Sequence, residues 1–480
     1  GLDLNLLKSK IYWPSGSHAG DDLFPTDLVR EESGLTILGV PIGTDQFIQK
    51  EFGAKLDKLR SSMEKLPKLN DSQVAFTLLH NCMGISMVNY FLRASPLKHT
   101  NQLALDYDTL VLEVLQNIIG SNFTRSQQQQ IRLPTKSGGL GLRSASTHAV
   151  AAFLSSFNSA SKFINDALEP NSEDMLFAQV FNSQLDGVVE QLNEKCGIVD
   201  VNSSNLTKSK SQKVISEAID TQTFNKFISR APQEIAARVH SCGGPNGALV
   251  LKAPLGKARG FRLSTQEFVI YISLRLGLDL SQFDPKREIC SGCKVAELDP
   301  KAYHCLICRS GAHGPVQRHN EFRDVLLHFC SKAVLNPKAE VPLHSATKKT
   351  PSDIYLPHGS GGKPTALDVT IVHPLSSTIQ SGAAKTPGYA NIEACKKKNF
   401  KHQEDCLKHG LVFIPLAAEI YGRFSDQLDK IIAFIATGIS NRTGSARSSV
   451  IADINRKLLF SLIRSCSRAV QARVPSRMVI

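Results

Sequence analysis

Four side chains of metal-binding type stand close together in the C-terminal half of the sequence. Two residues separate Cys290 from Cys293, three separate His304 from Cys308, and ten separate the two pairs. Three thiolates and one imidazole are a common donor set for a structural zinc ion, and each short pair can turn back on one ion about 2.3 Å from each sulfur. The spacing therefore predicts a tetrahedral zinc site.

Neighbouring residues leave the exact ligand set open. Gly292 favours a tight turn between the first two cysteines. Cys305, His313 and His319 are alternative ligands of the same chemical types. Ordinary buried cysteines would be the non-functional explanation, but the segment is polar and rich in turns and lacks apolar periodicity, which favours a metal site.

Two aspartates further on indicate a second kind of chemistry. Asp353 ends a Pro-Ser-Asp turn, and Asp368 lies inside the apolar run "ALDVTIV", where burying a lone carboxylate costs roughly several kcal/mol. If the segment between them forms a hairpin, the carboxylates converge, and a Mg²⁺ ion would relieve their repulsion and activate water for phosphodiester hydrolysis. The alternative is an Asx turn at Asp353 and an edge contact at Asp368.

A basic helix expected at about 391–409 supplies ammonium groups for the same chemistry. Lys398 and Lys401 are three residues apart and share a helix face. A lysine beside the carboxylates could orient a nucleophile or stabilise transition-state charge. We predict Lys398 and Lys401 as catalytic residues and Lys396 and Lys397 as contacts to nucleic acid.

The elements needed to position these residues can be read from the flanking pattern. A helix is expected at "RHNEFRDVLLHFCSKAVL", strands at "SDIYLP", "ALDVTIV" and "LVFIPLAAEI", and one or two helices at the C-terminus. Helix, antiparallel strands, helix, strand is an α/β pattern long enough to have its own core. A change in composition places a domain boundary near Lys286.

The preceding part of the chain is expected to be mainly helical. Helical spacing runs from Asp45 to about Phe157, interrupted by the turn "LPTKSGGLGLRSA". Weaker helices are expected over 166–285, with "VNSSNLTKSKSQK" as an exposed linker. We expect "GLTILGVPIG" to form a strand and "HAGDDLFPT" to form a solvent loop, although its Gly-Asp-Asp mimics a polymerase turn.

Length and charge narrow the class of protein. A chain of 480 residues suggests roughly three domains of about 150 residues. No apolar stretch approaches the ~20 residues of a membrane span, and no signal peptide is visible. From Lys286 onward there are 28 Lys and Arg against 15 Asp and Glu, while the preceding residues are neutral. This asymmetry predicts a polyanion partner, with a solvated basic surface as the alternative.

Cysteine content and the first residue give two further expectations. Eleven cysteines, an odd number, fit a reducing compartment with one metal cluster better than a secreted disulfide framework. The chain begins with Gly rather than Met, from which we expect a piece of a larger product.

In their order, these motifs resemble a known family, the non-LTR retrotransposons that carry a C-terminal restriction-like endonuclease. The chain is similar to reverse-transcriptase-like proteins that end in a Cys/His zinc knuckle and a PD-(D/E)xK nuclease. The resemblance covers nearly the whole sequence, through "GLDLNLLKSKIYWPS", "LGVPIG", "LRASPLKHT", "QQQIRLPTKSGGLGLRSASTHAVAAFLSS", "CSGC", "HCLIC", "RHNEF", "PSDIYLP", "ALDVTIV", "KKKNFKHQEDC" and "FIPLAAEIYG".

The resemblance implies a multidomain α+β protein. Its expected parts are a reverse-transcriptase palm remnant at 1–45, a thumb-like helical region at 46–165, a helical connector at 166–285, a zinc knuckle at 286–315, an α/β restriction-endonuclease-like domain at 316–440, and basic C-terminal helices at 441–480.

It also implies roles for individual residues. Asp353 and Asp368 would be magnesium ligands and Lys398 the catalytic lysine, with Lys401 and His402 in the place of a Lys-Tyr pair. Further implied roles are zinc ligands at Cys290, Cys293, His304 and Cys308, a basic pair for nucleic acid at Arg318 and His319, and outer carboxylates at Glu321 and Asp324.

The function that follows is a Mg²⁺-dependent DNA endonuclease that nicks target DNA for primed reverse transcription. We expect DNA and the element's RNA as partners, a nuclear location, no membrane and no small-molecule substrate. The chain departs from the family pattern at Ser352, Leu367 and His402, and the polymerase aspartates are missing, so no reverse-transcriptase activity is expected. The alternative is a catalytically decayed, zinc-containing nucleic-acid-binding protein.

Overall fold

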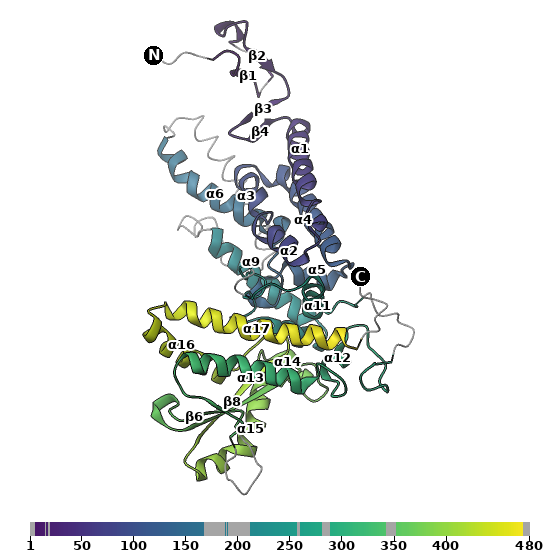
Figure 1. Ribbon diagram of the computed structural model, residues 1–480. Coiled ribbons are helices and arrows are strands. Elements are labelled where there is room, and N and C mark those ends of the chain that lie inside the picture. Colours follow the sequence, from purple (N-terminus) through teal and green to yellow (C-terminus); the bar gives the residue numbers. More distant parts are fainter. Residues whose placement is uncertain are drawn as a thin grey trace. The chain divides into compact units, whose positions relative to one another are not determined.

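A computed structural model describes residues 5–14, 16–17, 20–167, 188, 190, 212–256, 260–280, 289–341 and 352–473 (Figure 1). The chain is mixed α/β, mostly helical, and forms two compact units. The first comprises 1–68, 78–115 and 142–225, and the second comprises 69–77, 116–141 and 226–480. The expected linker "VNSSNLTKSKSQK" lies outside the described residues up to residue 211, and a helix begins at Gln212.

Two small sheets stand at the start of the first unit. Strands β1 (Lys10–Tyr12) and β2 (Val29–Glu31) pair in parallel, and β3 (Gly34–Ile37) and β4 (Val40–Gly43) pair antiparallel. The expectation of one strand in "GLTILGVPIG" is wrong. Leu38 and Gly39 have φ of 48° and 86°, which makes the two-residue turn of a β-hairpin.

Helices make up most of the remaining described residues of the first unit, and the helical spacing predicted from Asp45 to about Phe157 is confirmed. They are α1 (Asp45–Met63), α3 (Ser86–Ala94), most of α4 (Leu97–Ile119), α6 (Ala145–Ala167) and most of α9 (Gln212–Arg230). Buried Asp108 on α4 holds the start of α6, because its carboxylate accepts hydrogen bonds from Ala145 N at 2.7 Å and Ser146 N at 3.1 Å. These bonds satisfy amides that a helix N-terminus otherwise leaves unpaired.

A four-stranded sheet is the centre of the second unit. Its order is β5 (Lys338–Ala339), β6 (Ile354–Leu356), β7 (Thr365–Val372) and β8 (Val412–Glu419). The first two pairs are antiparallel, whereas β7 and β8 are parallel. The first five residues of β7 are buried, as is typical of a strand covered on both faces.

Helices surround this sheet. The second unit contains part of α2 (Ser72–Asn81), α5 (Arg125–Arg132), α10 (Gln233–Cys242), α11 (Thr265–Leu276), α12 (Tyr303–Ile307), α13 (Pro315–Lys332), α14 (Gln380–Lys385), α15 (Tyr389–Lys408), α16 (Asp426–Thr443) and α17 (Arg447–Gln471). Helix α15 makes the crossover from β7 to β8, and α17 packs beside α13 and α16 (Figure 1). The predicted order of helix, antiparallel strands, helix and strand is confirmed. None of the described helices has the length and apolar character needed to cross a membrane.

The glycine-rich turn after α5 is buried against two arginines of the second unit. Gln130 Nε2 donates to Gly138 O at 3.1 Å and to Arg275 O at 2.9 Å. Arg275 Nη2 donates to Gly139 O at 2.9 Å, and Arg238 Nη2 donates to Gln130 Oε1 at 3.1 Å. Both guanidinium side chains belong to residues that are 2 % exposed. The expected turn is therefore a tertiary contact that α10 and α11 hold in place.

Candidate functional site

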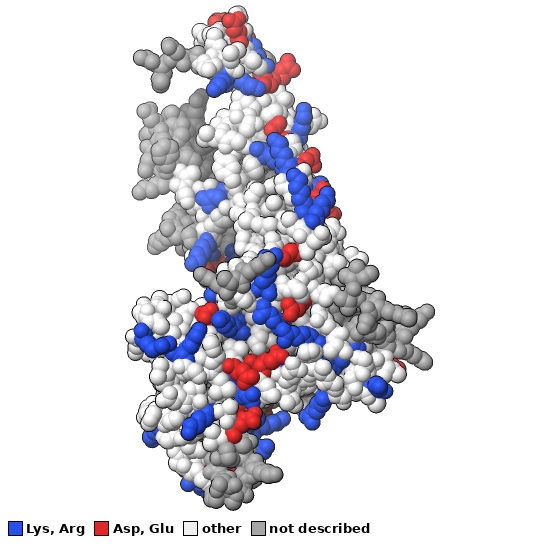
Figure 2. All heavy atoms as spheres, in the orientation of Figure 1, with Lys and Arg blue, Asp and Glu red and all other residues white. Residues whose placement is uncertain are grey.

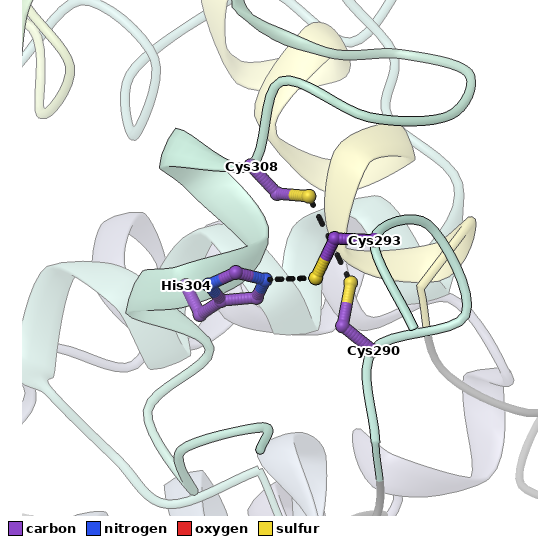
Figure 3. A group of neighbouring side chains, drawn as sticks. All are labelled: Cys290, Cys293, His304 and Cys308. Carbon is purple, nitrogen blue, oxygen red and sulfur yellow. Dashed lines mark hydrogen bonds between the residues drawn. The ribbon is translucent and has the colours of Figure 1, made fainter. Parts of the chain in front are cut away.

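The four predicted zinc ligands converge on one point (Figure 3). Their ligand atoms all lie within 4.8 Å of one another, with Cys290 Sγ 3.8 Å from Cys308 Sγ and Cys293 Sγ 3.4 Å from His304 Nε2. A tetrahedral zinc ion with ordinary bond lengths requires about 3.8 Å between two sulfurs and about 3.5 Å between sulfur and nitrogen. The cluster could therefore bind a metal ion such as zinc.

The first pair of cysteines is set by a tight turn of the backbone. Cys290 N donates to Ala296 O at 2.9 Å, and Lys294 N donates to Cys290 O at 2.8 Å. A Cβ atom on Gly292 would lie 2.7 Å from Ser310 O. Glycine is needed here because another segment of backbone approaches closely.

The second pair is set by a short helix, α12, with an acidic cap. Both carboxylate oxygens of Asp299 accept backbone hydrogen bonds, from Tyr303 N at 2.8 Å and His304 N at 2.8 Å. The cap fixes the first turn of α12, so that His304 and Cys308 are presented about one turn apart. The sequence analysis did not identify Asp299, although an aspartate shortly before a helix is a usual capping signal.

The electrostatic environment favours the thiolate at Cys293, whereas burial raises the pKa of Cys290, which also belongs to the cluster. Hydrogen bonds from the Ala296 and Val295 amides, with a smaller effect of His304, lower the pKa of Cys293 to about 6. Burial raises the pKa of the Cys305 thiol to about 12, and Cys305 lies outside the cluster. A thiolate is the form that binds metal, so Cys293 is suited to a ligand role and Cys305 to packing.

A buried arginine clamps the second half of the cluster. Arg473, which follows α17, is 1 % exposed and donates to Cys308 O at 3.0 Å, Ser310 O at 3.0 Å and Ala312 O at 3.2 Å. Outer hydrogen bonds of this kind orient metal ligands. Arg473 lies 165 residues from Cys308, and the sequence analysis missed it because no local signal links the two.

The predicted carboxylates also come together. Ile354 pairs with Leu367 in the antiparallel register of β6 and β7, which places Asp353 opposite Asp368. Asp353 Oδ2 accepts from Val369 N at 2.6 Å. The Lys398 ammonium on α15 lies 2.9 Å from Oδ1 and 2.9 Å from Oδ2 of Asp368. Three of the four predicted catalytic residues thus form one carboxylate cluster, Asp353, Asp368 and Lys398.

The environment separates the pKa values of the two carboxyl groups. Burial raises the pKa of Asp368 to about 6, and the charge of Asp353 adds to the rise, while Lys398 opposes it. Burial also raises the pKa of Asp353, but the hydrogen bond and charge of His319 outweigh this, so the net shift is downward. The two groups therefore titrate as a coupled pair.

Helix α13 corrects the prediction of a basic pair for nucleic acid. Arg318 is 4 % exposed and donates to Leu306 O at 2.9 Å, so its guanidinium is engaged inside the protein. His319 Nε2 lies 3.1 Å from Asp353 Oδ2 and 3.1 Å from Val369 O. His319 therefore lies beside the carboxylate cluster. It is not a surface contact for nucleic acid, and it is not a member of the Cys/His cluster.

The proposed outer carboxylates do not join the cluster either. Glu321 accepts a hydrogen bond from Ser465 and lies 3.6 Å from Arg468 on α17. Asp324 pairs with Arg323 at 2.9 Å. Both side chains therefore have partners elsewhere in the second unit.

Glu321 and Asp324 line an open groove of about 570 Å³ beside α13 and α17. Figure 2 shows Lys and Arg side chains over α17, with Asp and Glu side chains next to them. The groove's charged residues are of both signs, namely Glu321, Asp324, Lys457, Arg464 and Arg468. Such a mixed surface is less suited to a polyanion than a purely basic one.

The outer side of α15 is more uniformly basic. Lys396, Lys397 and Lys401 are exposed, and Lys396 pairs with Glu393 at 2.9 Å. Phe400 among them is 96 % exposed. The side chain of Lys401 therefore faces solvent, three residues after Lys398. Lys401 does not join the carboxylate cluster, in contrast to the catalytic role predicted for it.

A row of aromatic side chains connects the Cys/His cluster with the four-stranded sheet of the second unit. The ring of His373, just after β7, packs edge-on against Tyr303 at a centroid distance of 5.9 Å and against Tyr421 at 5.7 Å. Leu375 N donates to His373 Nδ1 at 3.1 Å. Tyr303 directly precedes the ligand His304, so the metal cluster and the end of β7 pack together.

His373 Nδ1 accepts the hydrogen bond from Leu375 N, so a second proton on the imidazole ring would break this bond. Burial lowers the pKa of His373 to about 4, with a contribution from the charge of Arg318. The unfolded chain then binds more protons than the folded chain between about pH 4 and 6.5, so stability falls as the pH falls through this window. We expect the wild type to lose about 2 kcal/mol more than His373→Phe between pH 7 and pH 5.

Urea unfolding of both proteins at the two pH values measures this difference. Equal losses in the two proteins would show that His373 is accessible to protons in the folded state.

No known family model matches the chain, and no curated protein matches it. The similarity to retrotransposon proteins accordingly rests on the motifs in the sequence. The metal-binding capacity of the Cys/His cluster follows from its geometry and does not depend on this similarity.

Proposed function

We propose that the chain is a metal-dependent DNA endonuclease whose active site is the carboxylate cluster of Asp353, Asp368 and Lys398. The observation that carries the proposal is the meeting of these three groups where the start of β6 lies beside the middle of β7. Asp353 directly precedes β6, Asp368 lies in β7 and Lys398 lies on α15. The order of helix, strands, crossover helix and parallel strand agrees with a restriction-endonuclease-like core.

The donor set fits a magnesium ion. Asp368 Oδ2 is buried and receives no hydrogen bond from the described residues, although the Lys398 ammonium lies near it. The bonds from His319 and Val369 both end on Oδ2 of Asp353. Magnesium is commonly bound through one or two carboxylates, with waters and phosphate oxygens completing its shell.

Asp353 and Asp368 would hold the ion, and Lys398 would serve the substrate. A magnesium ion bound there would lower the pKa of an attacking water and neutralise charge on the scissile phosphate. The Lys398 ammonium, fixed by Asp368, provides a positive charge for the phosphorane-like transition state or for orienting the nucleophile. The exposed lysines Lys396, Lys397 and Lys401 are placed for phosphate contacts outside the cluster.

The family resemblance supplies the biological context of this proposal. The enzyme would nick target DNA so that the new 3′-OH primes reverse transcription of the element's RNA in the nucleus. Under the same proposal, residues 1–45 are a palm remnant, 46–165 a thumb-like region and 166–285 a connector. A zinc knuckle at 286–315, a nuclease domain at 316–440 and basic helices at 441–480 complete the assignment.

One observation favours a second candidate, a nucleic-acid-binding protein with a decayed nuclease. Each carboxylate already has a partner within the protein, since Asp353 contacts the His319 imidazole and Asp368 pairs with the Lys398 ammonium. The cluster is therefore compensated without an ion. The departures at Ser352, Leu367 and His402 point the same way.

A plasmid-nicking assay in Mg²⁺ distinguishes the two candidates. We expect wild-type protein to convert supercoiled DNA to the open circle, and Asp368→Ala to do so at least about 100-fold more slowly, because it removes a metal ligand and the partner of Lys398. Asp324→Ala, an exposed aspartate on α13, is the matched control and should retain activity.

The assay also has an outcome that favours binding alone. Wild-type protein that does not nick, yet retards DNA on a gel as strongly as Asp368→Ala does, would rule out the nuclease.

A further inference from the structure

We propose that His319 is a positioning residue that orients the Asp353 carboxylate toward the bound metal ion. The inference rests on the proposed function, since it assigns His319 to the same site. Neither the zinc spacing nor the basic pair anticipated this role. His319 comes from α13, an element that contributes no other member to the carboxylate cluster.

The contacts of the ring fix which atom donates. His319 Nε2 lies 3.1 Å from Asp353 Oδ2 and 3.1 Å from Val369 O. Both neighbours are acceptors, so Nε2 carries a proton and shares it between them. At the other end of the ring, Nδ1 lies 3.3 Å from Asn320 Oδ1. An amide oxygen only accepts, so this second contact is a hydrogen bond when the ring carries both protons. Only 26 % of the side chain is exposed.

These contacts connect the two carboxylates through the backbone. Val369 directly follows Asp368 in β7, and its N–H also donates to Asp353 Oδ2, at 2.6 Å. His319 therefore closes a small network in which Asp353 is tied to the peptide unit next to Asp368. Two donors on Oδ2 fix the rotation of the Asp353 carboxyl group and direct Oδ1 away from them.

A cation between two carboxylates benefits from such an arrangement. Carboxylates that ligate metals are usually held by hydrogen bonds from outer residues, and losing one such partner typically weakens metal binding by about 10–100-fold. A side chain that only filled space between α13 and the sheet would need no donor at this point. The donor at Nε2 distinguishes positioning from packing.

Manganese binding provides a test that does not depend on catalysis. Protein with its Cys/His cluster loaded with zinc is titrated with Mn²⁺, and free ion is followed by electron paramagnetic resonance. Sulfur ligands favour zinc over manganese, so Mn²⁺ reports on the carboxylates. We expect His319→Leu to bind Mn²⁺ about 10–100-fold more weakly than wild type. His319→Gln, whose amide can donate from a similar position, should recover binding to within about 3-fold.

Two further variants make the result specific. His328→Leu changes an exposed histidine on the same helix, outside the carboxylate cluster, and should bind Mn²⁺ as wild type does. Asp368→Asn should abolish the carboxylate-dependent binding. Far-UV circular dichroism of each variant checks that it is folded. If the leucine variant does not fold, the glutamine variant keeps the test decisive.

The outcomes separate this inference from the proposed function. If wild-type protein binds no Mn²⁺ through Asp368, the metal-dependent nuclease itself is rejected, and with it the role of His319. If Asp368→Asn abolishes binding while His319→Leu binds Mn²⁺ as tightly as wild type, or while a folded His319→Gln binds it about 10-fold or more weakly than wild type, the nuclease stands and the positioning role is overturned.

Discussion

Cys308→Ser is expected to release the metal from the Cys/His cluster and to destabilise the second unit by about 3 kcal/mol or more. In small zinc domains the apparent binding free energy of ~10–16 kcal/mol acts as folding free energy. Cys308 Sγ is 3.8 Å from Cys290 Sγ, and its carbonyl also accepts from Arg473 at 3.0 Å. Zinc content by mass spectrometry should fall from one ion per chain to nearly none, with a matching loss in urea unfolding.

Cys305→Ala is the matched control for this experiment. Cys305 is fully buried three residues earlier, and its thiol lies outside the cluster. The alanine variant should keep its zinc and lose only the packing of one sulfur atom. Zinc retained by Cys308→Ser and lost by Cys305→Ala would show that the ligand set has been assigned wrongly.

Gly139→Ala is expected to destabilise the second unit by about 3–5 kcal/mol. A Cβ atom at this position would lie 2.0 Å from Leu133 O and 2.5 Å from Gln130 O. Both are backbone atoms, which cannot rotate away as the end of a side chain can. The carbonyl of Gly139 is also fixed, because Arg275 Nη2 donates to it at 2.9 Å.

Chemical unfolding followed by far-UV circular dichroism measures this effect. Gly256→Ala is the control and should leave the free energy of unfolding nearly unchanged, because no atom of the described residues beyond its chain neighbours lies within 4 Å of the added Cβ. The single tryptophan, Trp13, lies in the first unit, so its fluorescence follows that unit separately. A change of less than 1 kcal/mol for Gly139→Ala would mean that the turn can move away from the new methyl group.

Local patterns were sufficient to predict the main elements of the second unit. The run "ALDVTIV" is rich in β-branched residues and became β7, while the helical spacing around Lys398 became α15. The metal cluster was also predictable, because short Cys/His spacings leave few ways to place four ligands around one ion. In both cases the information lies within about 30 residues of chain.

The contacts that could not be predicted from the sequence involve partners far along the chain. Arg318 and His319 are adjacent and both basic, but successive helix residues point about 100° apart. One guanidinium therefore reaches Leu306 O and the neighbouring imidazole reaches Asp353. The clamp by Arg473 was missed for the same reason, since the carbonyls that it satisfies lie more than 160 residues earlier in the chain.

The hairpin of β3 and β4 at the start of the first unit was not predicted, for a different reason. Leu38 adopts a positive φ, which is uncommon for a residue with a Cβ atom. The usual turn signal would have been Asn-Gly or Asp-Gly. A Leu-Gly pair inside an apolar run instead resembles a continuous strand.

The contact between Gln130 and Arg275 has a consequence for biosynthesis. The two residues are 145 positions apart, which at about 5–20 residues per second corresponds to a delay of roughly 7–30 s on the ribosome. During that interval the glycine-rich turn has been made, but Arg275, which binds the carbonyls of Thr135 and Gly139, has not. Long-range contacts of this kind slow folding, so the early segment is a natural client for chaperones until the later half of the chain emerges.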